Sequence, residues 1–277
     1  MYRFLLLTIW AISAFSYAED DNFKIKIGIF SSLSDSGMET SVPWEASPYE
    51  IDFEDDLNLD KRSILPLVEF LYQRDERHSF FIDWRRLHRK SSRIGVSKPF
   101  EFELDDEFYS IEVDANIETT FNVDISRIGY GYSFYQNEKW DIKALIGLHV
   151  MLFELRFAGD IEVCNSQECE PIDNTRTNSI FTDITAPLPN FGLSAGYDIS
   201  DDWRIFTKVQ YFYIHLDQIT GELVDLSISA DYSITDSVAV SLSYEYYDIS
   251  VDASGDNASL DVHYGFKGPM LALIYSF

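Results

Sequence analysis

Hydrophobic side chains occupy every second position over long stretches of this chain. The clearest stretch sets Val238, Val240, Leu242, Tyr244 and Tyr246 between small or polar residues. Similar alternation runs through residues 128–134, 140–152, 203–213 and 226–232. A period of two belongs to a β-strand with two unlike faces, and helical spacing fits none of these runs. The pattern therefore predicts an all-β chain.

Two all-β architectures alternate in this way, the soluble sandwich and the membrane barrel. Tyr and Trp lie near the ends of the apolar rows here, whereas Lys, Arg, Asp and Glu lie on the opposite rows. Aromatic girdles on one face and a polar interior on the other are typical of a transmembrane barrel. A sandwich would instead pack small aliphatic residues between its sheets. The sequence thus favours a single antiparallel up-and-down transmembrane β-barrel.

Ten strands can be counted, and eight or twelve remain as alternatives. They are expected at residues 22–33, 63–73, 77–88, 117–135, 139–157, 179–198, 202–217, 222–233, 237–250 and 259–277. An even number is the rule for bacterial barrels. Pro187 and Pro189 fall inside the sixth strand, where proline cannot donate a ladder hydrogen bond. Either they mark a bulge or that strand starts near Asn190.

The connections between these strands alternate in length. Short turns are expected at residues 74–76, 136–138, 200–201 and 234–236, whereas long loops span 34–62, 89–116 and 158–178. Bacterial barrels have short periplasmic turns and longer extracellular loops. The rhythm therefore predicts that both termini lie in the periplasm and that the long loops are extracellular.

The two ends of the chain carry targeting features. Residues 1–18 combine Arg3, an apolar run from 4 to 12 and small residues at 16 and 18, which predicts a signal peptide and a barrel of residues 19–277. The final strand repeats Leu271, Leu273, Tyr275 and Phe277 at every second position. This arrangement resembles the C-terminal recognition strand of bacterial outer-membrane barrels, and the resemblance implies that the barrel-assembly machinery reads it. In general plan the chain is similar to OmpA-like and OmpW-like barrels, which implies a bacterial outer-membrane location.

Composition excludes one class of partner. The formal net charge is -26, aromatic residues make up 16%, and the mean hydropathy is -0.12. Nucleic acid binding requires basic patches, so nucleic acid is not an expected partner. Outer-membrane lipid and lipopolysaccharide are the expected surroundings, and the sequence does not indicate an oligomeric state.

Charges of both signs fall on the rows that should face the lumen. The inward candidates are Lys26, Glu69, Asp83, Arg85, Arg127, Asp141, Lys143, Arg204, Lys208, Asp231 and Glu245. Unpaired charges are costly in a narrow interior, so a paired network is expected. Barrels of this size are narrow enough to be filled by side chains. A plugged lumen is therefore favoured over a narrow conducting path.

The long loops carry three further candidates. Residues 50–60 and 101–107 are acidic and could bind calcium or magnesium unspecifically, but Lys61 and Leu67 break the calcium-loop motif that begins at Asp56, so no metal site is predicted. Cys164 and Cys169, the only cysteines, are expected to form a local disulfide. A basic cluster, Arg86, Arg89, Lys90 and Arg93, has the guanidinium chemistry to contact lipopolysaccharide phosphates, or it balances the acidic loop.

Three functions follow from this reading. The first is a non-enzymatic envelope protein with a filled lumen, which contributes membrane integrity or surface contact through its loops. The second is a narrow channel in which Lys143, Arg127 and Glu69 set selectivity. The third is a hydrolase at the outer rim, either a protease using His215 and Asp217 with Asp55 and Asp56, or a lipid A modifying enzyme using His88 and Ser91. No catalytic residue or cofactor is assigned. The protease residues do not match the order of the known Asp-His dyad, and the lipid A set has no identified acid.

Overall fold

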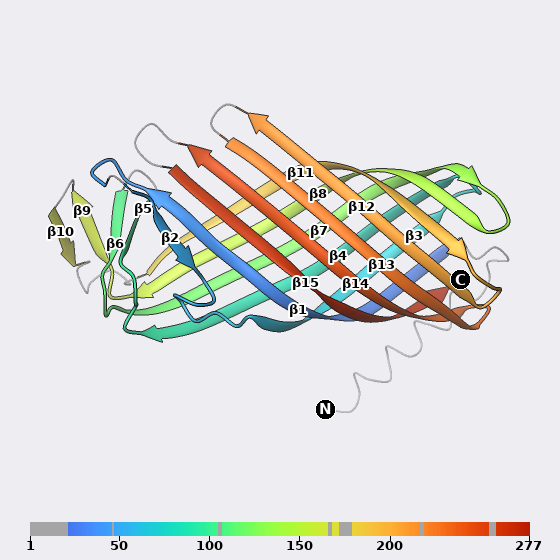
Figure 1. Cartoon of the computed structure of the whole chain (residues 1–277), viewed down its shortest axis with the longest axis horizontal. Coiled ribbons are helices and arrows are strands. Elements are labelled where there is room, and N and C mark those ends of the chain that lie inside the picture. Colours follow the sequence, from blue (N-terminus) through green and yellow to red (C-terminus); the bar gives the residue numbers. More distant parts are fainter. Residues whose placement is uncertain are drawn as a thin grey trace, which may run out of the picture.

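Ten long strands form a closed antiparallel barrel (Figure 1). The computed structural model describes residues 22–45, 47–104, 107–165, 168–171, 179–216, 219–254 and 259–277, and the predicted signal peptide lies outside this part. The barrel strands are β1 (Phe23–Ser41), β3 (Arg62–Gln73), β4 (His78–Ile94), β7 (Asn116–Gln136), β8 (Trp140–Gly159), β11 (Ser179–Asp198), β12 (Trp203–Leu216), β13 (Ile219–Thr235), β14 (Val238–Ser254) and β15 (Ser259–Ser276). Pairing of β15 with β1 closes the ring.

Each of the ten predicted strands corresponds to one barrel strand, so the predicted fold is confirmed. No helix among the described residues is long and apolar enough to cross a membrane. The short turns lie together at one end of the barrel, here called the turn end, and the long connections lie at the other, here called the loop end (Figure 1).

The long connections are not simple loops, which corrects the sequence prediction. β1 continues to Ser41 and β4 to Ile94, so both strands extend past the positions where loops were expected. The remaining parts form β2 (Tyr49–Asp52), β5 (Phe100–Leu104), β6 (Glu107–Ile111), β9 (Glu162–Asn165) and β10 (Glu168–Pro171). β2 pairs with β1, and the other four make a separate sheet in the order β10-β9-β6-β5. This sheet, here called the head, stands beyond the loop end (Figure 1).

The two prolines lie within a continuous strand. Pro187 pairs with Val150 and Pro189 with Leu148, and no register shift interrupts the described ladder between β11 and β8. The alternative in which this strand starts near Asn190 is therefore wrong, and the ladder has no bulge there. β11 pairs with β12 only from Phe191 onward. The described residues of β11 before Phe191 pair with β8 alone. The two prolines, which lack an N–H group, therefore remove no hydrogen bond to β12.

The outward face of the barrel changes from apolar to polar along its length. Near the turn end, Phe23, Tyr72, Trp140, Trp203 and Tyr275 form an exposed aromatic ring, and exposed aliphatic residues such as Ile27 (59%) follow above it. The outward residues Leu271 and Leu273 of β15 lie in this belt and are 51% exposed. Such a belt with an aromatic girdle is the lipid-facing surface of a barrel.

The inward face changes in the opposite sense. Polar and charged residues line the turn-end half, whereas the loop-end half holds one apolar core. Barrel residues such as Leu87, Phe121, Met151, Leu223 and Tyr264 pack there. Phe53, Leu57 and Leu59, from the connection after β2, enter the same core and are at most 2% exposed. Residues 53–60, here called the plug segment, thus close the loop end.

Candidate functional site

A buried ion network crosses the middle of the lumen. Arg127 on β7 donates from Nε to both carboxylate oxygens of Asp83 at 2.8 Å and pairs through Nη1 with Asp225 on β13. Lys208 Nζ on β12 lies 3.2 Å from the same Asp225 carboxylate. Asp83, Arg127 and Asp225 are at most 2% exposed. Hydrogen bonds between a guanidinium and carboxylates are charge-assisted and strong, and these hold three strands together across the barrel.

A second pair completes the layer. Arg85 on β4 binds Glu245 on β14, and both residues are buried. The layer therefore contains three acids and three bases, which removes the cost of burying an uncompensated charge. Asp225 was not among the lumen residues predicted from the sequence. It could have been found, because Asp225 lies two residues before Ser227 on the polar row of the same strand.

The remaining predicted lumen residues lie nearer the turn end. Asp141 sits between Lys143 Nζ at 3.3 Å and Arg204 Nη2 at 3.6 Å. Lys26 lies opposite Glu69, and Arg204 opposite Asp231, in the strand registers. These residues and those of the central layer, Arg127 and Asp225 excepted, line a cavity of about 520 Å³ that reaches the turns. All eleven predicted lumen residues thus face inward.

The plug segment is fixed by an ion pair in the loop-end half. Glu54 accepts from the Ser36 backbone N at 2.9 Å and from Ser36 Oγ at 2.8 Å, and it also pairs with Arg89. Arg89 donates to Ser36 Oγ at 2.7 Å and to the Asp60 carbonyl at 3.3 Å, and its guanidinium lies 5.5 Å from the Phe121 ring centre. A cation over an aromatic face adds to this stabilisation. Residues of the plug segment do not line the cavity at the turn end.

The basic cluster is divided between two faces, which corrects the prediction of a lipopolysaccharide contact at Arg89 and Arg93. Arg89 is 4% exposed inside the barrel, and Arg93 lies on the same inward row. Arg86 and Lys90 point outward and pair with Asp124 and Glu118 respectively. The period of two separates even from odd positions on β4, so one surface cannot present all four side chains.

The acidic loop residues have protein partners. Asp56, 6% exposed, binds Lys98 Nζ at 3.0 Å and the Asp52 backbone N at 3.1 Å. Asp55 pairs with Lys61 at 2.7 Å. The described residues contain no cluster of three acids, histidines or cysteines with the geometry of a metal site.

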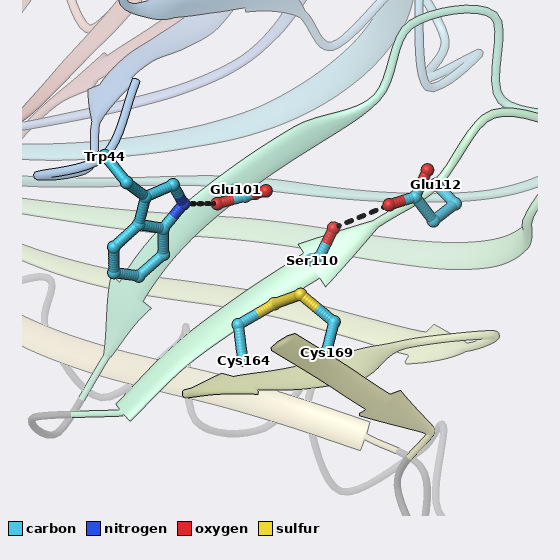
Figure 2. The surroundings of a disulfide bond; sticks show 6 residues. All are labelled: Trp44, Glu101, Ser110, Glu112, Cys164 and Cys169. Carbon is cyan, nitrogen blue, oxygen red and sulfur yellow. Dashed lines mark hydrogen bonds between the residues drawn. A yellow bond between two sulfur atoms is a disulfide. The ribbon is translucent and has the colours of Figure 1, made fainter. Parts of the chain in front are cut away.

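A disulfide joins β9 and β10, two neighbouring strands of the head (Figure 2). Cys164 on β9 lies opposite Cys169 on β10 and also opposite Phe108 on β6. Trp44 packs edge-on against Phe108 at 4.6 Å and donates to Glu101 Oε2 at 2.7 Å. Burial raises the pKa of Glu101, and burial together with Glu101 raises the pKa of Tyr49 to about 12.

The comparisons with known proteins identify the architecture. No family model and no curated protein matches the chain. Among solved structures, outer membrane protease OmpT of Escherichia coli superimposes with a TM-score of 0.57 at 9% identity, over 95% of this chain and 99% of that one. The NalP translocator domain of Neisseria meningitidis gives 0.40 at 11% identity, over 99% of this chain and 95% of that one. This chain has the fold of a bacterial outer-membrane β-barrel protein. At these identities the likeness extends to the fold alone, and only the first score is high enough to support it.

Where the structure describes them, the rim residues considered for catalysis bond to other residues of the chain. His88 bonds Asp124 at 2.8 Å on the outward face, whereas Ser91 faces inward and donates to the Leu57 carbonyl. His215 bonds Thr220 at 2.9 Å, and Asp217 lies outside the described residues. Asp55 and Asp56 are engaged by lysines. His88 and Ser91 therefore lie on opposite faces of β4, and the described residues do not include the whole protease set.

Proposed function

We propose that this protein is a non-enzymatic barrel of the bacterial outer membrane that is closed to solutes and makes contacts through an ordered head outside the cell. In this orientation the turns and both termini are periplasmic. The observation that carries the proposal is the filling of the loop-end half of the lumen by the apolar core and the plug segment. A barrel built to conduct would leave a polar path along its whole length.

The head supports the contact function. Its strands and their flanks present carboxylates in excess over cations, and those described include Glu101, Glu103, Glu107, Glu112, Glu162, Glu168 and Glu170. Lys98 is the basic residue of this region among those described. The strands carrying the head are paired beyond the lipid-facing belt, which holds the acidic surface away from the membrane. The partner should therefore be a basic surface, attracted by complementary charge.

Lipid and lipopolysaccharide surround the barrel in this proposal. Arg86 is 53% exposed at its side chain and Lys90 60%, on the outward face just above the lipid-facing belt. These two side chains are the ones available for lipopolysaccharide phosphates. The terminal strand, with Tyr275 and Leu273 outward, would be the segment that the assembly machinery reads.

A narrow channel is the second candidate, because charged residues of both signs line the turn-end cavity of about 520 Å³. Conduction would require the plug segment to leave and the Arg85–Glu245 pair to separate. A rim hydrolase is less well supported, since His88 and Ser91 lie on opposite faces of β4.

Single-channel recording tests closure. Mature protein is refolded, barrel closure is checked by heat-modifiable gel mobility, and conductance is measured in a planar bilayer. We expect no steady steps. Steps that change with Lys143→Glu would make the channel function primary and refute the closed lumen.

A binding assay tests the head. Refolded protein in zwitterionic detergent is passed over immobilised polylysine, and the triple variant Glu103→Gln, Glu168→Gln, Glu170→Gln is compared with Asp201→Asn, Asp202→Asn, Asp236→Asn at the turn end. The two variants remove the same charge. We expect the head variant alone to lose retention, and the retention to weaken with salt. Equal loss in both variants would contradict a role for the head.

A further inference from the structure

The turn-end cavity has no part in the function proposed above. The residues at its deep end lie at the same height along the barrel axis, here called a level. Ser227 on β13 lies opposite both Lys208 and Glu245, and Glu245 pairs with Arg85. The next level toward the turns pairs Ser229 with Ser243, and the level after that pairs Arg204 with Asp231. The cavity thus presents a fixed series of polar groups along its axis.

Hydrogen-bond donors remain unused at the deep end. Ser243 lines the cavity, is 5% exposed, and its Oγ has no partner among the described residues. Arg85, 7% exposed, makes no hydrogen bond through Nε to a described residue, and its ion partner there, Asp83 Oδ1, is 3.9 Å away. Lys208 has one described ion partner, Asp225, for an ammonium group with three N–H donors. Buried donors without partners are rare in folded proteins, so this concentration of them indicates a missing acceptor.

Acidic residues are concentrated at the mouth of the cavity. Asp201, Asp202 and Asp236 from the turns line it, together with Glu76 and Asp198. Asp231, further in, has a buried Oδ1 without a partner among the described residues. The cavity is therefore rich in acceptors and negative charge at its mouth and in spare donors at its deep end, which is complementary to a zwitterion.

We propose that this cavity binds a short peptide with its free carboxylate toward Lys208, Arg85 and Ser243 and its ammonium group toward the acidic mouth. Asp231 and Ser227 are four residues apart on β13, which is about 13 Å at the rise of a strand. An extended peptide spans at most about 3.3–3.6 Å per residue, so three or four residues fit this separation. A volume of about 520 Å³ is within the range of sites for ligands of this size.

Calorimetry on the full refolded chain tests the site, with tetra-alanine as the probe. We expect saturable binding, weakened about tenfold or more when the peptide carboxylate is amidated, since hydrogen bonds to a charged group are strong. Ser243→Ala should weaken binding of the free acid about as much. Ser241→Ala is the matched control, because Ser241 lies on the same inward row, is fully buried and has an unpartnered Oγ among the described residues, but does not line the cavity.

Three results would overturn the proposal. They are the absence of saturable heat at millimolar peptide, equal binding of the acid and the amide, and equal loss in Ser241→Ala and Ser243→Ala. Gel mobility confirms that each variant is folded before titration. A conducting barrel would refute the closed lumen proposed above and would leave these three criteria unchanged, so the two failures are distinguishable.

Discussion

Replacing Arg89 with methionine should release the plug segment without unfolding the barrel. Arg89 and Glu54 are 1% and 2% exposed at their side chains, and Glu54 would keep only its two bonds from Ser36. Its carboxylate would then be buried without a counterion. Because methionine has a similar volume and no charge, the change removes the ion pair and keeps much of the packing.

The expected magnitude follows from that burial. Removing one partner of a buried ion pair typically costs about 3–5 kcal/mol. At about 1.4 kcal/mol per tenfold, the equilibrium population with the plug segment displaced should rise by about two to three and a half powers of ten. The ten-strand ladder should be unaffected, since β4 keeps its backbone pairing with β7.

Hydrogen exchange measures this opening directly. The Phe53 amide bonds the Ser36 carbonyl and the Leu59 amide bonds the Phe53 carbonyl, both at 2.9 Å, so these two amides should exchange faster in Arg89→Met. Amides of the β7–β8 ladder should keep their protection, which separates local from global opening. Lys90→Met is the control, because Lys90 is exposed and its pair with Glu118 is a surface pair.

Two results would refute the reasoning. One is unchanged exchange at Phe53 and Leu59 in Arg89→Met. The other is failure of the double variant Arg89→Met, Glu54→Leu to restore most of the protection, since an apolar pair of similar volume can replace a buried ion pair.

Three further changes test other parts of the structure. Replacing Cys164 and Cys169 with serine should destabilise the head by about 2 kcal/mol, as expected for a short closed loop, and proteolysis should detect this while the barrel stays closed. Gly268→Ala should lower barrel stability to urea by about 1–3 kcal/mol, because Gly268 has φ 156° and an added Cβ would collide with the Ser31 carbonyl. Gly265→Ala should cost less, because the closest atom to an added Cβ there is the end of the Asp248 side chain. Because the pKa of Glu101 is raised, head stability should fall as the pH rises from the usual carboxyl pKa of 4.5 through the raised one. Glu101→Gln should flatten this pH dependence. Trp44 fluorescence measures it, since Trp44 bonds Glu101, and Trp44→Phe is the blank.

The sequence predicted the barrel because a lipid-facing strand has an unusually regular pattern. Val240, Leu242 and Tyr244 must be apolar toward lipid, and Ser241 and Ser243 must be small or polar toward the lumen. The same rule separated the lumen charges correctly, including Arg127 and Asp83. Strand number followed from it, since each lipid crossing requires one such run.

The pattern failed where the surroundings change. Beyond the lipid-facing belt the outward residues of β1 become Asp35, Gly37 and Glu39 while Ser36 and Met38 turn inward, so the sequence there was interpreted as an acidic loop. On β4 the run from Arg86 to Arg93 was treated as one basic surface, although alternate residues face opposite ways. The head could not be predicted because its strands have five residues or fewer, too short to show a period.

The two halves of this barrel are built for two solvents. In the turn-end half the outside is apolar and the inside is charged, as a strand needs when one face meets lipid. In the loop-end half the outside carries Asp35, Asp124 and Glu154 and the inside carries Phe121, Met151 and Tyr264, as in a soluble β-protein. A core of that kind cannot also be a water path, because filling it with water would expose the apolar surface that stabilises it. In the function proposed above, the same strands that cross the lipid therefore close the lumen beyond it and fix the base on which the head stands.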